Sequence, residues 1–195
     1  LIDSTITNLG ERLMPLLNSL ATPYAEALLQ VTEARGESQT VADQCKQLLE
    51  IWDSSADFRN AMVSPVLEPD AKKKALHALV GEQVTPSMLN LLKVLADRQR
   101  LLAFDAVMLR YLELYREQQG ITLAEVRSAQ TLTEDQQAAL SKKVQAMAGT
   151  NKVDIDLSVD PSLIGGFVVS LGSQVIDASL AGQVRRLGLA LAKAS

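Results

Sequence analysis

The 195-residue sequence has few of the side chains from which active sites and metal centres are usually built. It contains a single cysteine, Cys45, and a single histidine, His77. One cysteine excludes an intramolecular disulfide and a cysteine-based zinc site, and one histidine excludes a pair of imidazole ligands. Only 4% of the residues are aromatic, so any core must be built mainly from Leu, Val, Ile and Ala.

The sequence also lacks a basic excess and a long apolar run. Its formal net charge is −4, which disfavours nucleic acid as a partner because nucleic-acid-binding proteins carry clustered positive charge. No apolar run is long enough to cross a bilayer, and even residues 88–96 include Asn90 and Lys93. We therefore expect no direct insertion into a membrane.

The remaining candidates for chemistry do not assemble into a site. Gly165-Gly166 leads into a predicted strand, whereas phosphate-binding glycines open a helix, so close backbone packing is the favoured interpretation. Cys45 shares an apolar stripe with Leu48 and Trp52, which favours a buried, unreactive thiol.

Charged residues give no stronger indication of catalysis. Asp154 and Asp156 share one face of a predicted strand, where solvated carboxylates are more common than cation ligands. His77 and the lysines at 72–74 are interpreted as parts of a solvated helix surface. We therefore expect no catalytic residue, no metal site and no cofactor.

Residues 1–119 have the pattern of amphipathic helices joined by short connections. Apolar side chains recur at helical spacing over residues 2–13, Pro15 predicts a break, and Thr22-Pro23 predicts a new helix start. Similar patterns predict the later helices, and this half is interpreted as a compact bundle of six helices. The later helices are the stripe from Val41 to Trp52, one opened by Glu68-Pro69, one begun by Thr85-Pro86 and one from Leu101 to Tyr115, and a short apolar piece between the first two ends at Pro65.

The pattern changes at Gly120, and residues 120–195 are interpreted as a small α+β domain. Thr133 and Gln136 have the spacing of a capping box at the start of a helix. Residues 153–160 alternate strictly and predict a half-buried strand, whose apolar face contains Val153, Ile155, Leu157 and Val159.

The end of the chain predicts a hairpin followed by a helix. Gly172-Ser173 lies between two apolar runs and indicates a two-residue turn that begins with glycine. Ser179 is expected to cap the final helix. The expected inner face of that helix consists of Leu180, Val184, Leu187 and Leu191. The fold class is thus mostly α, with the α+β domain at the C-terminus.

Two helices of the first half have more apolar surface than a small bundle can bury, so we expect a groove for a partner helix. Ala27 is the informative position, because a small side chain leaves room for another helix, although it is also compatible with an ordinary core alanine. The expected groove residues are Tyr24, Ala27, Leu28 and Val31 in one helix, and Met88, Leu91, Leu92 and Leu95 in the other.

Two stretches, ATPYAEALLQVTEA and IDLSVDPSLIGGFVVSLGSQVIDASLAGQVRRL, resemble the delta subunit family of F-type ATP synthase. The mitochondrial relative of this family is the oligomycin-sensitivity-conferring protein. The resemblance covers most of the chain. The residues GSQVIDASLAGQVRRLG are most similar to those of cyanobacterial or plastid members. The second stretch is the more specific one, and its signature residues are Asp160, Pro161, Gly165, Gly166, Gly172, Asp177 and Ser179.

This resemblance implies a non-catalytic clamp that holds the stator of ATP synthase together. The helical domain would hold the N-terminal helices of the α subunits of the catalytic head, and a contribution from the β subunits is left open. The C-terminal domain would grip the b-type subunits of the peripheral stalk. There, Arg185 and Arg186 would reach acidic stalk ends or the carbonyls of their own helix.

The resemblance also implies a location and leaves two questions open. The complex would lie on a coupling membrane, with a plastid or cyanobacterial thylakoid favoured over a bacterial plasma membrane. Residues 1–20 extend beyond the expected family core, and a native extension is favoured over a segment of a b-type stalk subunit. The alternative functions are a helical scaffold for another partner and a small enzyme that uses Asp154, Asp156 and His77.

Overall fold

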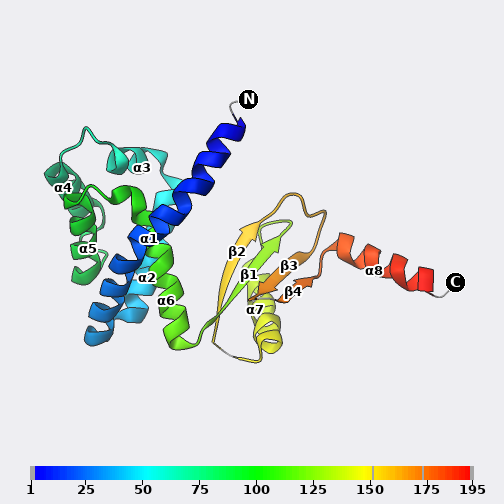
Figure 1. Cartoon of the computed structure of the whole chain (residues 1–195). Coiled ribbons are helices and arrows are strands. Elements are labelled where there is room, and N and C mark those ends of the chain that lie inside the picture. Colours follow the sequence, from blue (N-terminus) through cyan, green and yellow to red (C-terminus); the bar gives the residue numbers. More distant parts are fainter. Residues whose placement is uncertain (1–2, 151, 173, 194–195) are drawn as a thin grey trace. The chain divides into compact units, whose positions relative to one another are not determined.

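The computed structural model describes residues 3–150, 152–172 and 174–193, and the chain separates into two compact units, Leu1–Glu117 and Gln118–Ser195 (Figure 1). The first unit is helical. Its elements are α1 (Asp3–Arg35), α2 (Ser38–Ser54), α3 (Ala56–Val63), α4 (Pro69–Val80), α5 (Pro86–Asp97), the short 3₁₀ helix η1 (Leu101–Ala103) and α6 (Phe104–Gln119).

Local capping residues begin several of these helices. The side chain of Thr85 accepts a hydrogen bond from the backbone N–H of Met88, and Pro86 occupies the first turn of α5, as the sequence predicts. Ser55 caps α3 in the same way through the N–H of Phe58. Helix α1 ends at Arg35, and the next residue, Gly36, has a positive φ of 68°, the left-handed conformation that glycine adopts most readily.

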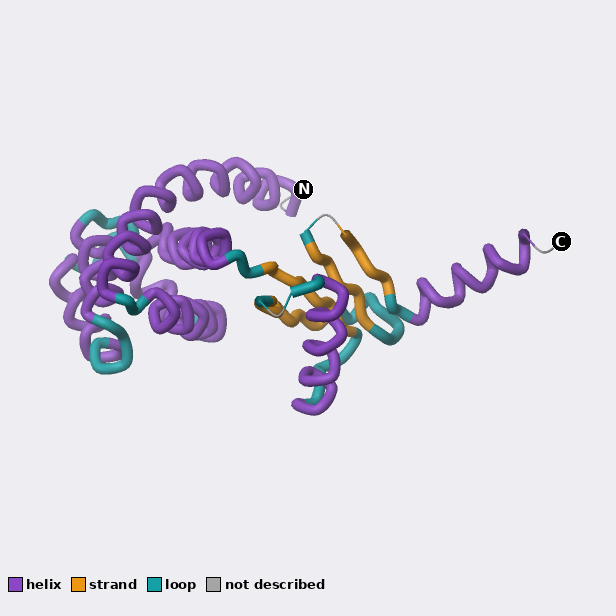
Figure 2. The backbone as a smooth tube through the Cα atoms, turned by 90° about the horizontal axis from the view of Figure 1, so that it is seen from below, coloured by secondary structure: helices purple, strands orange, loops and turns teal. Residues whose placement is uncertain are grey.

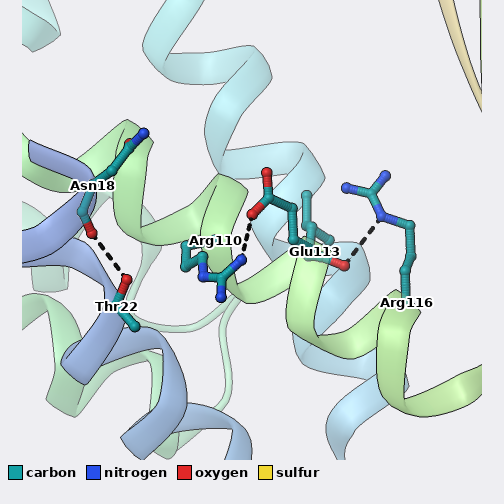
Figure 3. A network of polar contacts seen from close by, with 6 residues as sticks. Asn18, Thr22, Arg110, Glu113 and Arg116 are labelled. Atoms are coloured by element: carbon teal, nitrogen blue, oxygen red, sulfur yellow. Dashed lines mark hydrogen bonds and ion pairs between the residues drawn. The ribbon is translucent and has the colours of Figure 1, made fainter. Parts of the chain in front are cut away.

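The predicted break at Pro15 and the predicted helix start at Thr22-Pro23 are wrong, because α1 is continuous from Asp3 to Arg35. An interior proline removes one backbone donor and costs about 3 kcal/mol, but tertiary packing can offset that cost. Ala21, Ala25 and Leu28 are almost fully buried around Pro23, and the hydroxyl of Thr22 donates to the carbonyl of Asn18 at 2.9 Å (Figure 3). The helix curves along its length (Figure 2).

The core of the helical unit is mainly aliphatic and includes a small aromatic cluster. The ring of Trp52 stacks on Phe104 with centroids 4.6 Å apart and meets the edge of Phe58. Cys45 is fully buried, which confirms the expected burial. Other fully buried large side chains of this unit are Val41, Leu76, Met88, Leu92, Leu95, Leu101, Val107, Met108 and Tyr111.

The second unit contains a four-stranded mixed sheet with α7 packed on one face. Its elements are β1 (Thr122–Ser128), α7 (Glu134–Ala148), β2 (Val153–Val159), β3 (Phe167–Leu171), β4 (Gln174–Asp177) and α8 (Leu180–Lys193). The strand order is β2-β1-β3-β4, with β1 and β2 parallel and the other pairs antiparallel. The expectation of a mostly helical chain with a small C-terminal α+β part is confirmed.

The core of this unit lies between α7 and the two central strands. The predicted capping box is present, because Thr133 accepts from the N–H of Gln136 and the Gln136 side chain accepts from the N–H of Thr133. The buried core residues are Ala124, Val126, Leu140, Val144, Val169 and Leu171.

Two apolar faces that the sequence predicted to be buried are exposed in part. In β2, Val153 and Ile155 pack against the core, whereas Leu157 and Val159 are 39% and 52% exposed. β2 is an edge strand, so its side chains have a neighbouring strand on one side only. Leu180 and Val184 are also exposed, because α8 leads away from the sheet (Figure 1). The side chains of Leu187 and Leu191 lie outside the described residues.

Candidate partner-binding surfaces

A groove of about 670 Å³ lies between α1 and α5 of the helical unit. Tyr24, Ala27 and Val31 lie along α1, and Ala27 is exposed, so it is not the core alanine of the alternative interpretation. Leu28 and Leu91 are 4% and 9% exposed and form the apolar floor. The full lining is Pro23, Tyr24, Ala27, Leu28, Val31, Arg35, Ser87, Asn90, Leu91, Val94 and Arg100.

The expected contribution of α5 to this groove needs correction. Met88, Leu92 and Leu95 have no exposed surface in the helical unit and do not line the groove. These three positions are spaced four and three residues apart, so they share the side of α5 that faces the core. Leu91 and Val94 are rotated away from that side and reach the groove instead. Periodicity identified an apolar helix here but not which of its sides packs inward.

Each end of the groove carries an arginine. The guanidinium of Arg100 donates to the hydroxyl of Tyr24 at 2.7 Å and lies 5.8 Å from the centre of its ring. At the other end Arg35 donates to the hydroxyl of Ser87 at 3.1 Å, and that hydroxyl donates to a carboxylate oxygen of Glu37 at 2.5 Å. Sequence patterning gave no signal for these contacts, because their partners are 50 or more residues apart.

The glycine pair of the C-terminal unit is packed against the start of α8. A side chain at Gly166 would meet the carbonyl oxygen of Ala178 at 2.5 Å, and its φ is +82°. A side chain at Gly165 would meet Leu180 at 2.7 Å. Both glycines therefore permit a close backbone approach, which agrees with the packing role that the sequence favoured. They also line a cavity of about 470 Å³ with β1 and α7 residues.

The other signature residues form turns at strand ends. Asp160, which precedes Pro161, accepts from both the N–H and the hydroxyl of Ser162, and Asp177 accepts likewise from Ser179. These bonds favour the ionised form and hold the pKa of each aspartate below its usual value. Ser179 also accepts from the N–H of Gly182, which is the expected cap of α8.

The two arginines expected to meet the stalk lie on α8. Arg185 and Arg186 are exposed, and Arg186 donates to the carbonyl oxygen of Asp177 at 2.8 Å. Exposed Leu180 and Val184 also lie on α8. The surface of α8 therefore combines apolar and basic side chains.

The last signature glycine lies in the predicted hairpin. Gly172 has a φ of +56° in the turn between β3 and β4, and Ser173 lies outside the described residues.

A buried polar network that sequence reasoning missed joins α1, α2 and α6. The hydroxyls of Thr32 and Tyr111 are 2.9 Å apart, and the Tyr111 hydroxyl also donates to the carbonyl of Ser38 at 3.2 Å. Tyr115 contacts the side chain of Gln39 nearby. Burial raises the pKa of Tyr111 to about 12, because the phenolate would be poorly solvated.

The residues considered for catalysis are divided between the two units. Among the described residues there is no group of three or more His, Cys, Asp or Glu side chains that could hold a metal ion. His77 is exposed on α4, and Asp154 and Asp156 lie on β2. Lys72 is buried, unlike the solvated position expected for it, because it lies on the same side of α4 as Leu76. Within the described part of the chain, the helices are too short or too polar to span a membrane.

Comparison with known proteins gives the same family over most of the chain. A family model described as "ATP synthase delta (OSCP) subunit" matches residues 20–191. The ATP synthase subunit delta of Parasynechococcus marenigrum (strain WH8102) is 98% identical over 182 residues, which make up 93% of this chain and 100% of that protein. The chromatophore subunit delta of Paulinella chromatophora is 67% identical over 180 residues, covering 92% of this chain and 99% of that protein.

A solved structure has a similar fold. A chain in the cryo-EM structure of the Toxoplasma gondii mitochondrial ATP synthase hexamer matches 88% of this chain and 97% of its own length, with a TM-score of 0.52 and 20% identity. The chain belongs to the ATP synthase delta (OSCP) family. The predicted family is thus confirmed, and so is the prediction of a non-catalytic subunit of ATP synthase.

Proposed function

We propose that this subunit joins the catalytic head of ATP synthase to the peripheral stalk, with one binding surface on each unit. The α1–α5 groove would hold an N-terminal helix of a head α subunit. The observation that supports this assignment is the groove itself, because Tyr24, Ala27 and Val31 present a row of accessible apolar side chains over a buried floor. Apolar grooves of this kind accept the apolar face of an amphipathic helix.

The C-terminal unit would hold the b-type stalk subunits. Its exposed apolar residues on α8, Leu180 and Val184, lie beside two arginines, Arg185 and Arg186. Burial of the apolar side chains would stabilise the complex, and the arginines would meet acidic residues of the stalk. Two surfaces on separately folded units would allow the protein to resist the torque of rotation.

The cyanobacterial and chromatophore relatives support a thylakoid-type coupling membrane as the location. ATP synthase is a membrane-associated complex, and this subunit would lie on the side of the catalytic head.

The head assignment is tested with the substitution Ala27→Asp in the full chain. A carboxylate in an apolar helix–helix contact should weaken binding of a head α-subunit N-terminal peptide by about a hundredfold or more, since an uncompensated buried charge costs several kcal/mol. Because Ala27 is exposed, the melting temperature should change little. Isothermal titration calorimetry and a thermal melt give the two readouts.

The matched control is Ala34→Asp, because Ala34 is also an exposed alanine of α1 but does not line the groove. This variant should bind the peptide like the unmodified chain. Equal affinity of both variants for the peptide would show that the head contact lies elsewhere.

A further inference from the structure

The charged side chains that line the α1–α5 groove are all basic. Of its eleven lining residues, only Arg35 and Arg100 are charged, although the whole chain has 23 acidic and 19 basic residues. The floor between them is apolar, so an occupant would meet positive charge only toward its ends. The groove therefore has an electrostatic character opposite to that of the chain as a whole.

Neither arginine has a carboxylate partner within 4.0 Å among the residues that the structure describes. Arg100 donates to Tyr24 and Arg35 donates to Ser87, both of which are uncharged acceptors, and the Ser87 hydroxyl in turn donates to the carboxylate of Glu37. Two other surface cations of this unit are paired: Lys73 lies 2.7 Å from a carboxylate oxygen of Asp97, and Arg110 lies 2.8 Å from one of Glu113. A guanidinium carries five N–H donors, so each arginine has donors left for a further acceptor.

The two arginines are held at a defined spacing along α1. Arg100 is anchored at Tyr24, and Arg35 lies eleven positions further along the same helix. Eleven residues correspond to about 16 Å and about three helical turns. Two side chains separated by this interval on a partner helix would also share one face of that helix.

We propose that Arg35 and Arg100 select a partner helix with a carboxylate near each end of its apolar face, the two separated by about three turns. This inference rests on the proposed helix-binding role of the groove and adds what distinguishes the correct helix from other amphipathic helices. Carboxylate–guanidinium pairs fix orientation and register, whereas the apolar floor supplies sequence-tolerant affinity. The chain's own α8, with its adjacent arginines at 185 and 186, has the wrong charge for this groove.

The experiment uses three synthetic peptides with the same apolar face, each about 18 residues long, enough for the three turns and stable ends. The first has glutamates eleven positions apart at the edges of the apolar face. The second has glutamines there, and the third has lysines. Their affinities for the full chain are measured by isothermal titration calorimetry at low and at high salt.

We expect the glutamate peptide to bind about 25-fold more tightly than the glutamine peptide, and the lysine peptide to bind most weakly. Each exposed pair is expected to contribute a factor of about five, the upper end for surface ion pairs. High salt should reduce the difference, because it screens exposed charges. Arg35→Gln and Arg100→Gln should each lower the preference about fivefold, whereas the control Arg98→Gln, an exposed arginine outside the groove, should leave it unchanged.

The possible failures are distinct. Equal binding of the glutamate and glutamine peptides would overturn the charge selection and leave the groove as a helix-binding site. Binding of none of the peptides would overturn both the charge selection and the proposed head-binding role. A preference for glutamate that persists in the double variant Arg35→Gln/Arg100→Gln would assign the selection to other residues and would also overturn the proposal.

Discussion

The hydroxyl groups of Thr32 and Tyr111 share a buried hydrogen bond of 2.9 Å, although 79 residues separate them in the sequence. The bond connects the C-terminal part of α1, which forms one wall of the groove, to the centre of α6. A second bond from Tyr111 to the carbonyl of Ser38 adds the start of α2. One tyrosine thus connects three helices, and its hydroxyl is the natural target for testing what holds the groove in place.

Tyr111→Phe should destabilise the helical unit by about 1–3 kcal/mol, because it removes both hydrogen bonds while it preserves the ring. Urea unfolding followed by circular dichroism measures the effect. The control is Tyr24→Phe, whose hydroxyl contacts exposed Arg100 and should contribute less than about 0.5 kcal/mol. Equal effects of the two substitutions would contradict a special role for the buried network.

The same tyrosine should give the protein a dependence of stability on alkaline pH. The folded chain raises the pKa of Tyr111 to about 12 from its ordinary value near 10, so the native state holds this proton more tightly than the unfolded state. The contribution of the protonated Tyr111 hydroxyl to the free energy of unfolding is therefore complete below about pH 10, and it is lost as the pH rises to about 12. The loss corresponds to about 2–3 kcal/mol. The difference between wild type and Tyr111→Phe should shrink over this interval, and a constant difference would contradict the prediction.

Gly166→Ala should destabilise the C-terminal unit by more than about 2 kcal/mol. The new methyl group would meet the carbonyl oxygen of Ala178 at 2.5 Å, in a residue whose φ of +82° already disfavours a side chain. Gly149→Ala is the control, since Gly149 has a similar φ of +66° but open space around its Cα. It should cost only about 1 kcal/mol. Hydrogen exchange of the backbone amides in β1 and β3 measures the loss of stability in both variants. Equal losses would show that the close approach of Gly166 to Ala178 contributes nothing to the cost.

Val184→Asp should weaken binding of b-type stalk subunits by about tenfold or more, because it places a charge in the apolar part of the proposed stalk surface. Val184 is 68% exposed, so the fold should tolerate the change. The control Gln183→Asp adds the same charge at a neighbouring exposed position with no apolar side chain to lose. Pull-down of the purified stalk subunits, with head binding measured in parallel, distinguishes a local effect from unfolding. Loss of head binding together with stalk binding would indicate one cooperative surface.

A fragment of residues 1–119 should fold without the rest of the chain. It contains the compact unit that ends at Glu117 and the complete helix α6. We expect a helical circular dichroism spectrum and a cooperative thermal transition, because the buried residues of this unit form a core of their own. A disordered fragment would show that its stability depends on residues 120–195.

The sequence by itself determined the features that depend on nearby residues. The caps at Thr85 and Thr133 follow from hydrogen bonds across one helical turn. The packing role of Gly165-Gly166 and the burial of Cys45 follow from local patterns in the same way. The family was also determined at this level, because its signature in residues 155–187 is a run of consecutive residues.

Tertiary structure decided the features that depend on which residues pack around an element. Helix α1 continues through Pro23 because buried neighbours such as Ala21 and Ala25 offset the lost hydrogen bond. Met88 faces the core and Leu91 faces the groove, although both are apolar positions of one helix. Periodicity specifies that a helix has an apolar side, but only the packing of distant segments determines how much of that side is covered. For the same reason the paired positions of Arg35 and Arg100 at the groove became visible only in the folded chain.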